Sequence, residues 1–209
     1  RQRQMCIRDR HEPATAARFD NLVAYDGNDP VGIGKSLAVF SAFAEGVSLY
    51  SAFAVLYSFQ MRNLLKGIGQ QMKWSVRDES LHSKMGCQLF RQMCSQIPGL
   101  KEECKAHIYE AAITMHNAEM VYISKLFEMG DIEGIKEYDL KQFIKKRTND
   151  KLKELGYNPT GSDEFGYDQK GVDALSWFYH LTGGHTHTDF FAVRPTDYSK
   201  ANEGEDFED

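Results

Sequence analysis

The stretch Trp74-Ser-Val-Arg-Asp-Glu-Ser-Leu-His82 lies within a run from Gln70 to Gln96 that contains no proline, and this run predicts one long helix. Glu79 and His82 are three residues apart, so their side chains leave the same helix face about one turn from each other. A carboxylate and an imidazole placed in this way can both reach one metal ion. Carboxylate-bridged di-metal bundles use this Glu-x-x-His element together with a lone Glu from a neighbouring helix.

The preceding segment offers such a glutamate. Glu45 is the only acidic residue between positions 31 and 77, and the run around it is otherwise apolar, aromatic or small. An ionised carboxylate in such surroundings is costly unless it is paired or bound to a metal. In an antiparallel hairpin Glu45 and Glu79 lie level only if the turn is centred near residue 62, where the first polar break falls. We therefore predict a turn between about Gln60 and Lys66.

Glu-x-x-His alone is a weak signal, because both residue types are common on solvated helix faces. Three observations favour a metal site over that interpretation. The helix around Glu45 is too apolar to be a surface helix, the acid lies in the middle of the run, and the two elements lie on consecutive helices. The sequence therefore predicts an all-α fold in which Glu45, Glu79 and His82 converge.

The remaining pattern predicts further helices in a single domain. The chain has 209 residues, of which 42% are hydrophobic, so it can bury a sizeable core. Gly32 and Gly34 are expected to delay the first long helix until about Lys35, and the basic run Lys145–Arg147 is expected to form a solvated face. His107 and His116 are too far apart to share a metal ion. The predicted helices cover residues 35–59, 70–96, 101–129 and 136–155, with a short helix or turn over 173–181.

Charge and cysteine content narrow the possible partners and location. The net charge of −5 gives no electrostatic footprint for nucleic acid, and no run approaches the roughly 20 apolar residues of a membrane span. The cysteines show neither zinc-site nor disulfide spacing. We interpret them as reduced thiols in a cytoplasmic protein. They are Cys6, Cys87, Cys94 and Cys104.

Two motifs in order, Ala44-Glu-Gly-Val-Ser-Leu-Tyr-Ser-Ala-Phe53 and Val76-Arg-Asp-Glu-Ser-Leu-His82, resemble the small, radical-generating subunit of class I ribonucleotide reductase. Ala174–Phe178 and Leu181–Phe191 are similar to that family's end-of-domain motif. Thr196-Asp-Tyr-Ser-Lys200, followed by an acidic end that contains a phenylalanine, is similar to its tail. The resemblance implies a ferritin-like helical bundle.

The resemblance also implies a site. Glu45, Glu79 and His82 would be metal ligands of a di-iron centre, with a manganese or mixed manganese and iron centre left open. Asp78 would belong to a radical-transfer route that also orients a ligand. Tyr198 would relay the radical between subunits. The centre would generate a radical and export it to a large catalytic subunit that reduces ribonucleotides to deoxyribonucleotides, and the small subunit would be a homodimer.

The chain divides into three predicted parts. Residues 1–17 match no feature of the resemblance and are expected to be a non-native or unstructured segment. Residues 18–191 are predicted to form a partial ferritin-like domain that lacks the N-terminal helices, which carry the family's second ligand set and radical-bearing tyrosine. Residues 192–209 are predicted to be a flexible acidic tail. In that tail Phe207 is predicted to bind the partner subunit. We expect this chain alone to bind metal poorly.

Two other functions stay open from the sequence. One is a different ferritin-like di-metal oxidase, which would need no partner-binding tail. The other is a non-catalytic helical protein that binds partners and whose Glu and His residues are incidental.

Overall fold

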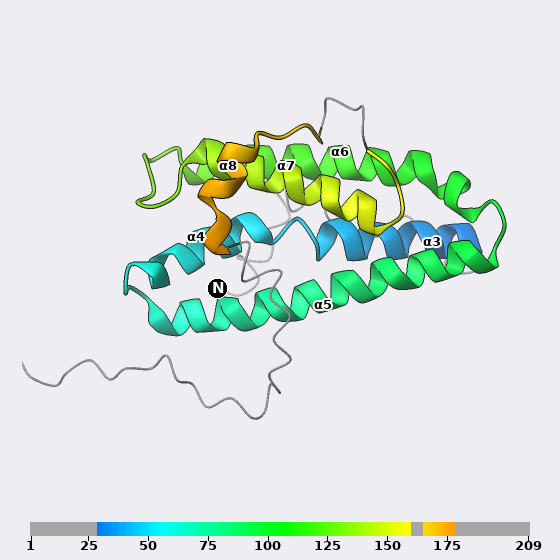
Figure 1. The fold of residues 1–209 in the computed structure, drawn as a ribbon, viewed down its shortest axis with the longest axis horizontal. Helices are drawn as coiled ribbons and strands as arrows, with labels where there is room; N and C mark the ends of the chain where they lie inside the picture. Colours follow the sequence, from blue (N-terminus) through cyan, green and yellow to red (C-terminus); the bar gives the residue numbers. More distant parts are fainter. Residues whose placement is uncertain (1–28, 160–164, 179–209) are drawn as a thin grey trace, which may run out of the picture.

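The structure, a computed structural model, describes residues 29–159 and 165–178 (Figure 1). These residues form helices and no strand, apart from one isolated bridge between Ile132 and Ile135. The elements are α3 (Pro30–Val39), the π-helix η1 (Phe40–Ala44), α4 (Tyr50–Met61), α5 (Lys66–Gln96), α6 (Leu100–Leu126), α7 (Glu137–Glu154) and α8 (Gln169–Ala174).

The first helix begins earlier than the sequence pattern predicts. The Asp29 side chain accepts a hydrogen bond from the Gly32 amide at 2.7 Å, and Pro30 occupies the first turn, so the helix starts at Pro30. The prediction that glycines delay the helix until Lys35 is wrong. Gly34 instead permits close packing, because a Cβ at this position would lie 3.3 Å from a cysteine sulfur of α6.

The prediction of a single helix over residues 35–59 is also wrong, because a π-helix and a short turn interrupt the helix. The Glu45 amide donates to the Phe40 carbonyl at 3.0 Å, and the Ser48 amide donates to the Phe43 carbonyl at 2.9 Å, each five residues back. Such wider turns are rare and occur often at functional sites. The break therefore falls at the candidate ligand Glu45 itself.

The hairpin between α4 and α5 turns where the sequence predicts it. Residues 62–65 join the two helices, and Asn63 and Leu65 adopt positive φ values of 62° and 47°. Helix α5 starts at Lys66 rather than Gln70 and runs for 31 residues without a break. A second tight turn at 97–99 leads from α5 into α6, as predicted.

The segment α3–η1–α4 runs through the middle of the bundle, with α5 on one side and the α6–α7 pair on the other (Figure 1). Apolar residues from the middle of the segment are buried, which confirms that the stretch around Glu45 does not form a surface helix. Helix α8 packs on α7. Apolar residues of the central segment that are at most 1% exposed are Ala38, Val39, Ala42, Phe43, Val47, Tyr50 and Ala54.

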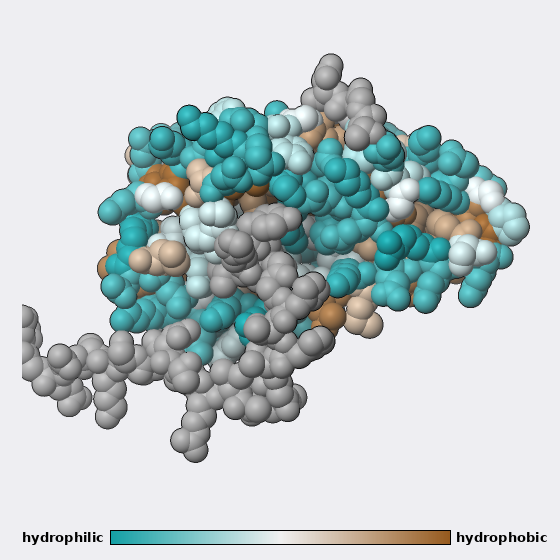
Figure 2. Space-filling model, in the orientation of Figure 1, coloured by the Kyte–Doolittle hydropathy of each residue, from teal (hydrophilic) through white to brown (hydrophobic). Residues whose placement is uncertain are grey.

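The surface in the view of Figure 2 is mostly hydrophilic. Among the residues that the structure describes, no helix combines the length and the apolar character that crossing a membrane requires. Cys87, Cys94 and Cys104 are free thiols, and burial raises the pKa of the Cys87 thiol to about 12. Cys6 lies outside the described residues.

Candidate metal centre

Three predicted ligands lie together between the turn after η1 and the first half of α5. Glu45, Glu79 and His82 each offer one ligand atom, and these atoms all lie within 4.8 Å of one another. His82 Nδ1 is 3.8 Å from Glu45 Oε1 and 4.0 Å from Glu79 Oε2. Two atoms bound to one ion through bonds of about 2.1 Å lie at most about 4.2 Å apart. Both distances from His82 fall below this limit, so His82 and either glutamate are within reach of one shared ion.

Glycines let the two backbones that carry these ligands approach closely. Gly86 of α5 faces Ser41 of η1, and a Cβ on Gly86 would lie only 1.8 Å from Ser41 Oγ. Gly46 is similarly tight, since a Cβ there would lie 2.7 Å from Ser83 Oγ of α5. The approach of η1 to α5, and hence of Glu45 to the α5 ligands, depends on these two positions.

The two carboxylates are held in an unfavourable electrostatic environment. The pKa of Glu45 is raised, first by burial and then by the neighbouring Glu79 carboxylate, while His82 acts in the opposite direction. Burial also raises the pKa of Glu79, with Asp78 adding to the rise and His82 opposing it. A cation placed between the two acids would offset the cost of burying their charges and would reduce the repulsion between them.

Asp78 lies beside the imidazole on the side away from the other acids. Its Oδ1 is 3.6 Å from His82 Nε2, which is an ion-pair distance rather than a hydrogen bond. The two ring nitrogens thus face different partners, Nε2 toward Asp78 and Nδ1 toward the two glutamates. An acid in this position favours a proton on Nε2, which leaves the Nδ1 lone pair available to a metal.

The sequence analysis did not identify Arg147 as a residue that supports the backbone next to Glu45. Arg147 Nε donates to the Gly46 carbonyl, and the guanidinium carbon lies 3.2 Å from the centroid of the Tyr50 ring. The Tyr50 hydroxyl in turn shares a hydrogen bond of 2.7 Å with Ser80 Oγ. All three residues of the run Lys145–Arg147 are only partly exposed, and Arg147 points inward, so the prediction of a solvated face is wrong. Three consecutive helical residues point in widely different directions, so one of them turns inward.

Two further polar residues are more buried than any candidate ligand. Glu119 of α6 is 1% exposed and accepts a hydrogen bond from Ser51 Oγ, which joins α6 to α4. His116 of α6 is 5% exposed. Glu119 is the only aspartate, glutamate, lysine or arginine between positions 111 and 124, and this is the same signal that marks Glu45, so the sequence could have indicated its burial. The other predicted residues, Tyr198 and Phe207, and the segments 1–17 and 192–209 lie outside the described residues.

Comparison with known proteins identifies proteins that are similar in sequence to this chain. The family model described as "Ribonucleotide reductase, small chain" matches residues 6–163, and so begins earlier than the motifs quoted above. A "Probable ribonucleoside-diphosphate reductase small subunit" of Invertebrate iridescent virus 3 is 31% identical over 206 residues, covering 95% of this chain and 52% of the viral protein. The "Ribonucleoside-diphosphate reductase subunit beta" of Chlamydia pneumoniae is 25% identical, covering 80% of this chain and 46% of that protein. The chain spans about half the length of these relatives.

A solved structure is similar in fold. A Bacillus halodurans protein assigned to the class I ribonucleotide reductases superposes with a TM-score of 0.71 at 20% identity, covering 86% of this chain and 64% of that one. This likeness agrees with the all-α, ferritin-like bundle predicted from the sequence. From the match over residues 6–163 and the relatives named above, the chain belongs to the family of ribonucleotide reductase small chains.

Proposed function

We propose that this chain forms part of the small subunit of a ribonucleoside-diphosphate reductase and that Glu45, Glu79 and His82 hold a metal ion of its radical-generating centre. One observation carries the proposal. In a member of this family, the carboxylate and imidazole atoms of these three residues lie within 4.8 Å of one another.

The donor set fits iron or manganese. Two carboxylates and one imidazole are hard to borderline ligands, whereas structural zinc sites are closed and rich in cysteine or histidine. The His82 side chain is 50% exposed, so this donor set leaves room for further ligands. When bound, a centre of this kind supplies one-electron oxidation chemistry with dioxygen.

The chain's own residues hold and orient the ligands. Glu45 and Glu79 supply the negative charge that balances a divalent cation. Asp78 keeps the His82 ring oriented, and Arg147 holds the backbone carbonyl next to Glu45. By analogy with the family, Asp78 would also take part in the transfer of the radical away from the centre.

A metal titration of the 209-residue chain tests the ligand assignment. We expect at most one Mn²⁺ ion per chain, bound weakly and detected by electron paramagnetic resonance of the free ion. Glu79→Ala should abolish this binding because it removes one of three ligands. Glu110→Ala, at an exposed position on α6, should leave it unchanged. Two ions per chain, or binding that survives Glu79→Ala, would contradict the assignment.

The proposed tail function has a separate test. We infer that residues 192–209 dock on a large catalytic subunit through Phe207, since a polar tail with one aromatic near its end suits binding that orders the segment. A peptide of these residues should compete with the full-length small subunit, and Phe207→Ala should weaken it by roughly 1–3 kcal/mol. Tyr198→Phe should preserve binding and abolish turnover. A peptide that fails to compete would refute this docking.

A further inference from the structure

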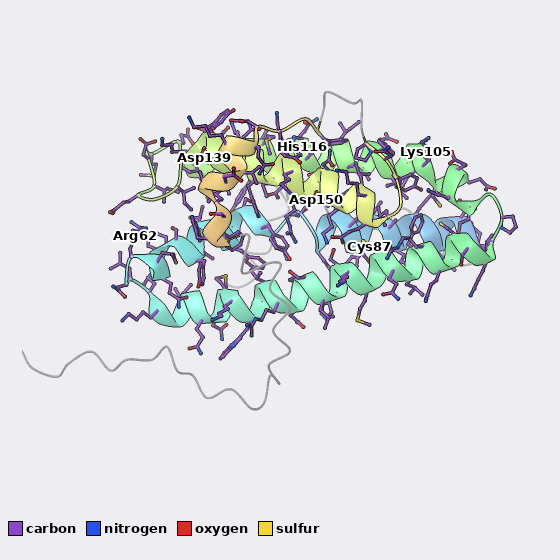
Figure 3. All side chains as sticks on the ribbon, viewed as in Figure 1. Arg62, Cys87, Lys105, His116, Asp139 and Asp150 are labelled. Atoms are coloured by element: carbon purple, nitrogen blue, oxygen red, sulfur yellow. The ribbon has the colours of Figure 1, made fainter. Side chains whose placement is uncertain are left out.

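A cavity of about 320 Å³ lies on the α6–α7 side of the molecule, away from the candidate metal centre. Figure 3 places His116 on this side, whereas Cys87 lies on α5 across the bundle. The cavity has a polar part and an apolar part. Its lining residues are Ile113, His116, Asn117, Met120, Lys145 and Phe165.

His116 brings an unsatisfied polar atom to this cavity. The side chain is 5% exposed, and its Nδ1 has no hydrogen-bond partner among the residues that the structure describes. The Phe165 ring packs edge-on against the imidazole, with centroids 5.6 Å apart, and so fixes its position. Leaving a buried polar atom without a partner costs about 1–3 kcal/mol. A ligand that enters the cavity and bonds to Nδ1 would recover this energy.

Lys145 supplies the charge. It forms no ion pair with any residue in the described ranges 29–159 and 165–178, in contrast to Lys141 and Lys146 on the same helix. Burial and the Lys145 charge together lower the pKa of His116 to about 4. At neutral pH the cavity therefore presents one ammonium group and one neutral imidazole, whose Nδ1 can carry a proton and donate it.

Size and charge together restrict the ligand. A volume of about 320 Å³ is near the lower end for small-molecule sites, so it suits a single ring or a short chain rather than a nucleotide. Ile113, Met120 and Phe165 give the site an apolar wall. One cation matches a monoanion, whereas a phosphate dianion would keep an unbalanced charge in a partly buried site.

We propose that this cavity binds a small organic carboxylic acid, whose carboxylate accepts hydrogen bonds from Lys145 Nζ and His116 Nδ1 and whose apolar body packs against Phe165. The Asn117 amide at the exposed rim offers a further donor. This site is separate from the candidate metal centre and does not depend on its function.

Benzoate is a suitable probe because it combines one ring with one negative charge. In a titration of the full 209-residue chain monitored by the ¹⁵N signals of the histidine rings, we expect benzoate to shift His116 saturably. Benzamide, which has the same shape without the charge, should bind at least about tenfold more weakly, as the loss of a charge-assisted hydrogen bond predicts. Inorganic phosphate, which lacks the apolar body and carries excess charge, should also bind at least about tenfold more weakly.

Variants distinguish specific binding in this cavity from nonspecific binding of benzoate. Lys145→Met should weaken benzoate binding about tenfold or more, while Lys141→Met, one turn earlier on α7, should leave it unchanged. Lys145 is half-buried at the cavity edge, so its loss should not prevent folding, which circular dichroism would verify. His116→Asn provides a second variant. The proposal is overturned if benzoate leaves the His116 signals unshifted, if benzamide binds equally well, or if Lys145→Met retains wild-type affinity.

Discussion

Gly86→Ala should destabilise the chain, although the same exchange in most helices is favourable. Replacing a helical glycine by alanine usually stabilises by about 0.5–1 kcal/mol. At Gly86 the new Cβ would lie 1.8 Å from Ser41 Oγ and 2.5 Å from Ser41 Cβ, and Ser41 is buried. Rotating the hydroxyl cannot relieve the contact between the two Cβ atoms, so the helices must separate. Overpacking costs about 1–3 kcal/mol. The upper half of that range is about 2–3 kcal/mol, and subtracting the helical gain of about 0.5–1 kcal/mol leaves a net loss of about 1–2.5 kcal/mol.

Urea unfolding followed by circular dichroism at 25 °C measures this change. Gly67→Ala is the matched control, because Gly67 lies in the same helix and a Cβ there would meet no neighbouring atom within 4 Å. That variant should gain about 0.5 kcal/mol of stability. The double variant Ser41→Gly/Gly86→Ala should recover most of the loss. If Gly86→Ala is as stable as the parent chain, or if Ser41→Gly fails to rescue it, the reasoning about this contact is refuted.

Three other changes test the electrostatics. Burial raises the pKa of Glu79, so the charged carboxylate increasingly opposes folding as pH rises through that pKa. Glu79→Gln should therefore stabilise the metal-free chain by about 0.5 kcal/mol at pH 7.5, after solvent screening. This gain should vanish at pH 4, and urea titrations at the two pH values would measure it. The pKa of His116 is lowered to about 4, so the free energy of unfolding should have its full value above about pH 6.5 and decrease as pH falls toward 4. The decrease should be about 1–2 kcal/mol at pH 5. His116→Gln should lack this pH-dependent part of the unfolding free energy. Arg147→Met removes the cation on the Tyr50 ring and the donor to the Gly46 carbonyl, and thermal unfolding should show a loss of about 1–3 kcal/mol; a loss below about 0.5 kcal/mol would contradict the bracing role.

Local spacing explains which parts of the site could be predicted. Glu79 and His82 share a helix, so three residues of separation fix their common face whatever packs around them. The polar break near residue 62 fixes the turn, and the turn sets Glu45 level with Glu79. These relations depend on short stretches of chain, and the structure reproduces them.

The features that could not be predicted depend on contacts between distant segments. Arg147 stands 101 residues from Gly46, and nothing in the basic run shows that its last member faces inward. Glu119 is more buried than Glu45, and its hydrogen bond with Ser51, 68 residues away, is a contact that local spacing cannot show. A lone acid in an apolar run therefore indicates burial, but it does not show which distant segment packs against that acid.

The π-helix Phe40–Ala44 behaves as an accommodated one-residue insertion. Successive residues of an α-helix are about 100° apart around the axis, so one additional residue rotates everything that follows by that amount. Helix α3 keeps its contacts with α6 while the chain beyond the insertion turns toward α5. The direction of Glu45 is thus set by the number of residues before it, and a deletion within η1 that preserved every chemical group of the centre would still aim this carboxylate away from its partners.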